Sequence, residues 1–279
     1  MTETHSRYYI IRRKLENFQP ADPHHAALWE FLLFGFKQGW ACLFGGLMLA
    51  LLLLTKWLWT PEIPLARYDF LFLCALMIQT AMLCFRLETL EEAKVIFIFH
   101  VTGTLMELFK TQAGSWNYPE AAFFRIGNVP LFSGFMYAAV GSYMARITRI
   151  FDMRYSNFPP ARQAFLLATA IYVNFFAHHF VPDCRNLLFL LTGAMFGQCT
   201  VYFRPHQTTR HMPLLLGFAL VALFIWLGEN IGSFTATWLY PHQLRAWQPV
   251  TLAKYGSWFL LMIISFVLVI AIHKPKPPD

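Results

Sequence analysis

Apolar residues along this 279-residue chain gather in runs close to twenty residues long, not in the alternating or short-stripe patterns of soluble domains. A helical run of that length matches the hydrocarbon thickness of a bilayer, so each run predicts a transmembrane helix. We predict eight spans, the third being the shortest: Gly39 to Leu58, Leu65 to Phe85, Ala93 to Leu108, Pro130 to Ile150, Ala164 to Phe180, Asn186 to Phe203, Pro213 to Ile231 and Tyr255 to Ile272. The predicted fold class is an all-α, polytopic membrane helix bundle.

The polar segments divide the chain into an arm, a membrane domain and a tail. Residues 1–27 are too polar for a cleaved signal peptide and predict a cytoplasmic N-terminal arm. Residues 28–273 form the predicted integral membrane domain, and residues 274–279 form a cytoplasmic tail. The stretch from Ala26 to Gln38 is amphipathic and is expected to lie along the membrane interface before the first span.

Lysine and arginine are distributed unequally between alternate loops. Fourteen lie in the arm, the tail and the loops predicted on their side of the membrane, against seven in the opposite loops. Because cytoplasmic loops carry the excess of basic residues, both termini of this multi-pass membrane protein are predicted to be cytoplasmic.

Composition narrows the classes of function. Hydrophobic residues make up 57% of the chain and charged residues only 13%, which excludes a water-soluble enzyme. The net charge of +7 comes from basic residues in short loops between apolar runs, so the predicted partner is the lipid bilayer and not a nucleic acid. The five cysteines form no CxxC pair and predict neither a disulfide framework nor a thiolate metal site.

One motif occurs twice at a fixed separation. The pattern E-x8-W-x-Y-P begins at Glu107 and again at Glu229, 122 residues later. The same offset aligns the second span with the sixth and the fourth with the eighth, so we predict two diverged four-helix halves, 28–150 and 151–273, in parallel repeat. Chance recurrence is the alternative, since only four positions match. Both copies are expected at the outer face.

The two glutamates are the leading candidates for chemistry. An ionisable group inside a span is costly and usually faces the bundle interior with a partner. Desolvation favours the protonated carboxyl group, so Glu107 or Glu229 could act as an acid, or hold a cation as a carboxylate. Alternatively, each glutamate locks helix packing. Lys110 is the cation nearest to Glu107 in sequence and could pair with it.

Histidine and asparagine residues near the glutamates are further candidates. His100 shares a helical face with Glu107, and Asn174 lies one turn before His178 on the fifth span. His178 is therefore a candidate catalytic residue with His100, while Asn174 and Asn230 are candidate pocket residues; packing, snorkelling and helix capping are the alternatives. No metal site is predicted, because the spacing matches neither HxxxH nor HExxH.

The aromatic residues of the repeated motif complete the predicted pocket. Trp116, Tyr118, Trp238 and Tyr240 are expected at the interface beside the glutamates. An aromatic lining suits an isoprenoid or another apolar lipid as ligand. The sequence identifies no cofactor.

A family resemblance rests on two stretches. The sequence HVTGTLMELFKTQAGSWNYPE, from His100 to Glu120, is followed by PLFSGFMYAAVGSY, from Pro130 to Tyr143. Together they resemble an uncharacterised family of bacterial integral membrane proteins of the YoaT type, described as domain of unknown function 817. The resemblance runs over most of the chain. It implies several membrane spans and a location in the bacterial inner (cell) membrane, but no activity.

A remoter resemblance concerns the intramembrane glutamate followed by an aromatic turn in repeated halves. This arrangement is similar to the membrane carotenoid hydratases and small lycopene cyclases, which implies chemistry that begins with protonation of a polyene. The PxE[ED] motif of the cyclases is missing, since Pro61-Glu62 and Pro119-Glu120 lack its spacing. The interpretation we favour is a lipid-modifying or isoprenoid-modifying enzyme; a transporter or channel for a small solute or cation, and a structural membrane protein, stay open.

Overall fold

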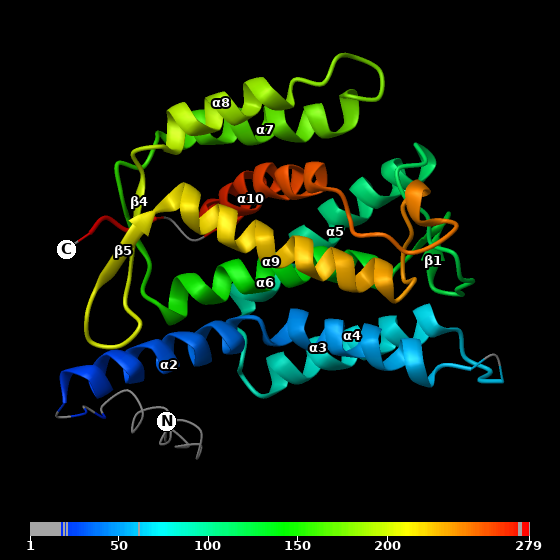
Figure 1. Cartoon of the computed structure of the whole chain (residues 1–279), viewed down its shortest axis with the longest axis horizontal. Helices are drawn as coiled ribbons and strands as arrows, with labels where there is room; N and C mark the ends of the chain where they lie inside the picture. The colour runs from blue at the N-terminus through cyan, green and yellow to red at the C-terminus, as the bar shows by residue number, and fades with distance from the viewer. Residues whose placement is uncertain (1–17, 19, 21, 61, 273–274, 279) are drawn as a thin grey trace.

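The computed structural model describes residues 18, 20, 22–60, 62–272 and 275–278, and most of them are helical. Most of the predicted arm, residues 1–17, 19 and 21, lies outside the described residues. The helices, labelled as in Figure 1, are α2 (Pro23–Ala41), α3 (Leu43–Leu58), α4 (Arg67–Cys84), α5 (Leu90–Gln112), α6 (Phe132–Ile150), α7 (Ala161–Ala177), α8 (Arg185–Phe196), α9 (Leu214–Phe234) and α10 (Leu252–Ile272), with a short 3₁₀ helix, η1 (Pro241–Gln243).

Each of the eight predicted spans overlaps one of the helices α3 to α10. Within the described residues, three helices, α4, α9 and α10, are long and apolar enough to cross a membrane, and α2 with α3 forms a fourth candidate if the bent pair counts as one span. These helices indicate a membrane protein. The full number of eight spans stays a prediction.

The prediction of an all-α chain is wrong in the connecting segments, which form two small sheets. Strands β3 (Arg154–Ser156), β4 (Thr200–Phe203) and β5 (Arg210–Pro213) make an antiparallel sheet in that order, with Tyr155 opposite Val201 and Val201 opposite Met212. Strands β1 (Arg125–Ile126) and β2 (Val129–Pro130) form a hairpin.

The sixth predicted span is correspondingly too long. Its helix, α8, ends at Phe196, and the segment predicted to continue it becomes β4. Gly197 follows the helix directly, and Thr200 to Phe203 are β-branched or aromatic residues, which favour extended backbone. The segment is apolar, as predicted, but it is a strand and not the end of a helix.

Helix α2 covers the stretch predicted as an amphipathic helix. It begins after Asp22, whose carboxylate accepts a hydrogen bond from the amide of His24 at 2.7 Å. Pro23 occupies the first helical position. The chain bends by 70° at Cys42 before α3 starts. The interfacial location of α2 stays a prediction.

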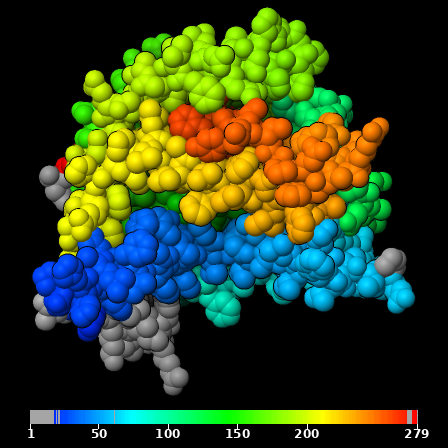
Figure 2. Space-filling view, viewed as in Figure 1, coloured from blue at the N-terminus to red at the C-terminus, as the bar shows by residue number. Residues whose placement is uncertain are grey.

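The helices lie in three layers (Figure 1). Helices α7 and α8 form one outer layer, α2, α3 and α4 form the other, and α5, α6, α9 and α10 lie between them. In the middle layer α5 packs along α6, and α9 packs along α10; α10 also contacts α7. Figure 2 shows α10 between α8 and α9 on the face turned to the viewer. The fully buried core includes Phe132, Phe196 and Met262.

The connections gather at two opposite ends of the bundle. The β3–β5 sheet lies at one end, and the segments that follow α5 and α9, including β1, lie at the other (Figure 1). The described part of the tail joins the β3–β5 end, because the amide of Tyr155 donates to the carbonyl of Lys276 at 2.9 Å. This end is the one predicted to be cytoplasmic.

A buried ionic cluster joins the start of α5 to α6. Glu88 and Arg146 are both fully buried, with 3.8 Å between the carboxylate and the guanidinium group. Ser142 and Gln79 also donate to the Glu88 carboxylate, at 2.5 and 2.6 Å. Such a pair is stable inside a bundle only because several hydrogen bonds offset the loss of solvation.

Candidate functional site

Helices α5 and α9 end in the same local structure, and each carries one of the predicted glutamates in its second-last turn. In α5 the amide of Ser115 donates to the carbonyl of Lys110 at 2.9 Å, and in α9 the amide of Thr237 donates to the carbonyl of Gly232 at 3.0 Å. Each amide is eight residues after its glutamate, and each carbonyl is three residues after it. The residue before that amide is left-handed, with φ of +70° at Gly114 and +54° at Ala236. These are two Schellman caps in equivalent positions, so the chain leaves both helices in the same way.

The two segments that follow these caps pair with each other. The amide of Asn117 donates to the carbonyl of Leu239 and the amide of Leu239 donates to the carbonyl of Asn117, both at 2.9 Å. Each of these residues is ten positions after its glutamate, so equivalent residues of the two motifs face each other. A reciprocal antiparallel pair of this kind has a local two-fold axis between its members.

Three hydrogen-bond donors converge on the carboxylate of Glu107. The Trp116 indole and the Tyr118 hydroxyl group donate to Oε2 at 2.7 and 2.8 Å, and the Tyr137 hydroxyl group donates to Oε1 at 2.9 Å. Glu107 is only 4% exposed. Burial raises the pKa of Tyr118 well above its usual range, so Tyr118 keeps the proton that it donates. Three donors satisfy an ionised carboxylate.

Glu229 is half-buried and has a simpler environment. The hydroxyl group of Tyr240 donates to it, as the equivalent Tyr118 does to Glu107. Burial raises the pKa of Tyr240 well above its usual range, so this phenol is also a donor. Trp238, the equivalent of Trp116, packs instead over Gly232, where an added Cβ would lie 2.1 Å from the indole ring. The two halves therefore share the tyrosine but not the tryptophan hydrogen bond.

Lys254, in the first turn of α10, lies between the two motifs. Its ammonium group is 4.1 Å from the ring centroid of Trp116 and 5.0 Å from that of Tyr240, and these two rings lie edge to face with centroids 6.1 Å apart. The ammonium group interacts electrostatically with both Glu107 and Glu229. One cation and two carboxylates thus form a single charged cluster behind an aromatic layer.

A cleft of about 350 Å³ opens beside this cluster, between α7, α10 and the segments after α5 and α9. Its lining includes Trp116 and Tyr240 from the two motifs and three cations, Lys110, Arg185 and Lys254. The sequence suggested that Lys110 could pair with Glu107, but it does not. Its ammonium group lies 3.0 Å from Nε2 of His179 and 3.5 Å from Nε2 of His178.

The turn between α7 and α8 forms the rim of this cleft. Asn174 donates to the carboxylate of Asp183 and accepts the amide of Cys184, both at 3.0 Å. Burial acts to raise the pKa of Asp183, but the hydrogen bonds from Asn174 and the Arg185 amide and the charge of Arg185 outweigh it and lower the pKa. Asp183 therefore stays ionised and holds the turn.

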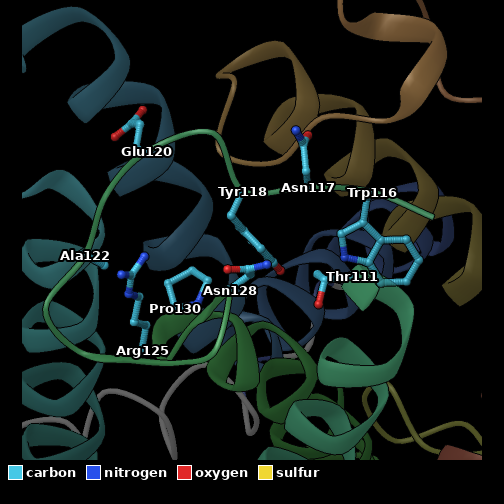
Figure 3. Close-up of a pocket in the computed structure, with 9 residues that line it drawn as sticks. All are labelled: Thr111, Trp116, Asn117, Tyr118, Glu120, Ala122, Arg125, Asn128 and Pro130. Atoms are coloured by element: carbon cyan, nitrogen blue, oxygen red, sulfur yellow. The ribbon is translucent and has the colours of Figure 1, made fainter. Parts of the chain in front are cut away.

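A smaller pocket of about 130 Å³ lies on the other side of Trp116. Figure 3 shows the loop from Asn117 to Pro130 curving round it, with Tyr118 and Asn128 pointing to its middle. Arg67, from α4, anchors this loop through an ion pair with Glu120 at 2.7 Å. Tyr118 thus separates the small pocket from Glu107.

Comparisons with known proteins match the chain over most of the helical bundle. The family model described as "Protein of unknown function (DUF817)" matches residues 30–266. The "Uncharacterized protein YoaT" of Bacillus subtilis (strain 168) is 40% identical over 250 residues, which cover 90% of this chain and 94% of the relative. The chain belongs to the DUF817 family. No solved structure matches it. The predicted similarity to carotenoid hydratases and lycopene cyclases stays a prediction.

Not every predicted residue of this DUF817 protein joins the cluster. His100 lines neither cavity; its ring packs against Phe135, with centroids 4.6 Å apart. The side chain of Asn230 donates to the carbonyl of Trp226 at 2.8 Å and accepts the amide of Val250 at 2.9 Å, so it ties α9 to the segment before α10. These contacts agree with the packing and capping alternatives.

Other residues of the site were missed in the sequence. Tyr137 and Lys254 reach the glutamates from α6 and α10, and no motif near Glu107 or Glu229 points to them. An ionisable residue at the start of a predicted span was the available signal for Lys254. Among the residues that the structure describes, no three His, Cys, Asp or Glu side chains converge as a set of metal ligands.

Proposed function

We propose that this DUF817 protein is a membrane-embedded enzyme that modifies an apolar lipid, such as an isoprenoid, by proton transfer from an intramembrane glutamate. The observation that carries this proposal is the meeting of two Glu-Tyr pairs with one lysine beside an aromatic-lined cleft. Paired titratable groups in different environments are typical of acid-base sites.

The environments of the two glutamates favour different roles. Three donors hold the carboxyl group of Glu107 in one orientation near Lys254, which suits a group that supports the site without reacting. Glu229 is half-buried and is hydrogen-bonded to Tyr240, which lines the cleft, so it is the glutamate linked most directly to a bound ligand. We therefore propose Glu229 as the acid and Glu107 as its electrostatic support.

The proposed reaction begins with transfer of a proton to one carbon of a lipid double bond from the hydroxyl group of Tyr240, which lines the cleft and takes up the Glu229 proton in exchange. The π-electron pair forms the new C–H bond, and the other carbon becomes a cation that the faces of Trp116 and Tyr240 stabilise. Water then adds to the cation and returns a proton to Glu229. Alternatively, an internal alkene adds, and loss of a proton from carbon restores the acid.

The proposed setting is the bacterial inner membrane, with eight spans and both termini in the cytoplasm. The opposite locations of the tail and the two motifs in the bundle support this topology. The equivalent caps and the reciprocal pairing of Asn117 and Leu239 support the proposed duplication of a four-helix unit.

The experiment compares the membrane lipids and pigments of a strain that lacks the gene with those of its parent. We expect the wild-type gene to restore the parental profile, Glu229→Gln to fail, and Glu229→Asp to restore it in part, because Gln keeps the size of the side chain but cannot give up a proton. Glu62→Gln, an exposed substitution remote from the cleft, is the control. If Glu229→Gln and Glu107→Gln insert normally and restore every feature, both glutamates are structural.

A transporter for a small solute or cation is the second candidate. The bend of 70° between α2 and α3 favours it, because broken helices are common in transporters. Dependence of the phenotype on an added cation, with unchanged lipids, would select this alternative.

A further inference from the structure

We propose that the cleft between α7 and α10 binds the phosphate headgroup of an amphiphilic lipid, with Lys110, Lys254 and Arg185 as its anion-binding residues. This names the substrate class of the proposed enzyme and rests on the proposed function for the membrane setting of the cleft. Binding itself requires no catalysis, so it can be tested separately.

The first argument is the sign of the charge that faces the cleft. Three cations contribute to the lining, while neither Glu107 nor Glu229 does. Asp183 forms an ion pair with Arg185 at 3.2 Å and so neutralises one of the three. The described residues that line the cleft thus include cations and no carboxylate, which favours an anionic ligand.

The second argument is the burial of Lys110. This side chain is only 3% exposed, and within the described part of the chain no carboxylate lies within ion-pair distance of Lys110 or Lys254. The ammonium group of Lys110 contacts His178 and His179 and lies 4.2 Å from the ring centroid of Phe175. A buried cation without a carboxylate partner destabilises the protein, and a bound anion would offset this loss of solvation.

The third argument is the geometry of the donors. An ammonium group supplies three donors, and a histidine that accepts one of them leaves others for a ligand. Lys110 comes from α5, Arg185 from the start of α8 and Lys254 from α10, so they approach the cleft from three directions. Ser115, Thr251 and Ser257 add neutral donors along the same lining. A phosphate group, with more charge and more oxygen atoms than a carboxylate, suits this set better.

The fourth argument is the apolar end of the same cleft. Ile171 and Phe175 of α7 and Leu260 and Leu261 of α10 complete the lining. These side chains are buried or half-buried inside the bundle, so a hydrocarbon chain that enters the cleft would contact them, while the cations sit nearer the end of the bundle where the two motifs pair. A ligand with an anionic head and a hydrocarbon chain matches both ends.

The test measures lipid binding by native mass spectrometry of the full-length protein purified in detergent. Phosphatidic acid is titrated against diacylglycerol with the same acyl chains, which lacks only the phosphate group. We expect phosphatidic acid to bind at least tenfold more tightly. Equal binding of the two lipids would overturn the proposal.

Variants test whether the three cations cause the preference for phosphatidic acid. Lys110→Met, Lys254→Met and Arg185→Gln should each weaken phosphatidic acid binding about tenfold, or about 1.4 kcal/mol. Lys56→Met is the matched control: Lys56 lies in the last turn of α3 at the same end of the bundle, contacts Phe234 and does not line the cleft. Should a methionine variant fail to fold, Lys110→Arg and Lys254→Arg, which keep the charge, are expected to retain the preference. Wild-type affinity in all three charge-removing variants would overturn the assignment.

A competition arm separates a lipid headgroup from free phosphate. If millimolar inorganic phosphate displaces the lipid from wild-type protein, the recognised group is phosphate itself; if it does not, the chain is part of the recognised ligand, and both results support the site. The readout is also independent of the proposed enzyme. If Glu229→Gln leaves the lipid profile intact while the cation variants lose binding, the proposed reaction fails and the binding site stands.

Discussion

At the scale of single residues, the site depends on neutral donors aimed at buried carboxylates. Removing the donor of Trp116 with Trp116→Phe leaves most of the ring but takes one hydrogen bond from Glu107. A lost hydrogen bond to a buried charged group costs about 1–3 kcal/mol, so we expect a lower unfolding temperature in detergent. Trp57→Phe is the control, because Trp57 is 72% exposed. Equal melting of the two variants would show that the indole does not support Glu107.

A second residue-scale prediction concerns Gly232. An added Cβ would lie 2.1 Å from the Trp238 ring, so Gly232→Ala must displace the indole and lower the stability of the protein. Gly46→Ala, on α3, meets no atom within 4 Å and is expected to be neutral or to stabilise by up to about 1 kcal/mol. Thermal unfolding of the two variants in the same detergent checks this. A stable Gly232→Ala protein would contradict the packing of Trp238.

At the scale of elements, the buried pair of Glu88 and Arg146 couples the start of α5 to α6. Arg146→Met leaves the Glu88 charge without its partner, and we expect a loss of about 3–5 kcal/mol of stability. The double variant Glu88→Gln with Arg146→Met should recover most of this loss, because no isolated charge remains. Chemical denaturation of the three proteins measures the coupling, and additive losses would contradict the ion pair.

Helix positions could be predicted from the sequence because their apolar runs are long, whereas the strands could not. Thr200 to Phe203 read as the end of a span, since short apolar segments do not distinguish strand from helix by hydropathy alone. The β3–β5 sheet depends on pairing between segments more than forty residues apart, such as Tyr155 with Val201. Such pairing is a property of the assembled bundle and leaves no local signal.

The same limit applies to the site. Glu107, Tyr118, Glu229 and Tyr240 were predicted because one motif contains them twice at one spacing, and their contacts repeat as well. Lys254 approaches from a helix that begins more than ten residues after the motif, so its part in the cluster depends on tertiary packing. A sequence repeat thus predicts the groups that share a local frame, but not those that another element supplies.

At the scale of the whole molecule, topology decides which side of the membrane the cleft faces. We predict that the loop near Asn157 is cytoplasmic and that the loop near His242 is external, from the basic residues of alternate loops. Single-cysteine variants at these two positions, in a protein without its own cysteines, can be labelled in intact cells with a membrane-impermeant thiol reagent. Labelling at position 242 and not at 157 is expected, and the reverse would invert the orientation.

The central claim is that the two copies of the repeated motif meet and form one site. The most direct test is a disulfide between Asn117→Cys and Leu239→Cys in a protein without its own cysteines and with a protease site inserted near Asn157. Facing residues of a hydrogen-bonded antiparallel pair have Cα atoms about 5.5 Å apart, which a disulfide can span. After mild oxidation in membranes and cleavage, we predict that the two fragments stay joined on a non-reducing gel and separate on reduction, while each single-cysteine variant separates in both. Separated fragments from the double variant without reductant, in protein that inserts normally, would contradict the meeting of the two motifs.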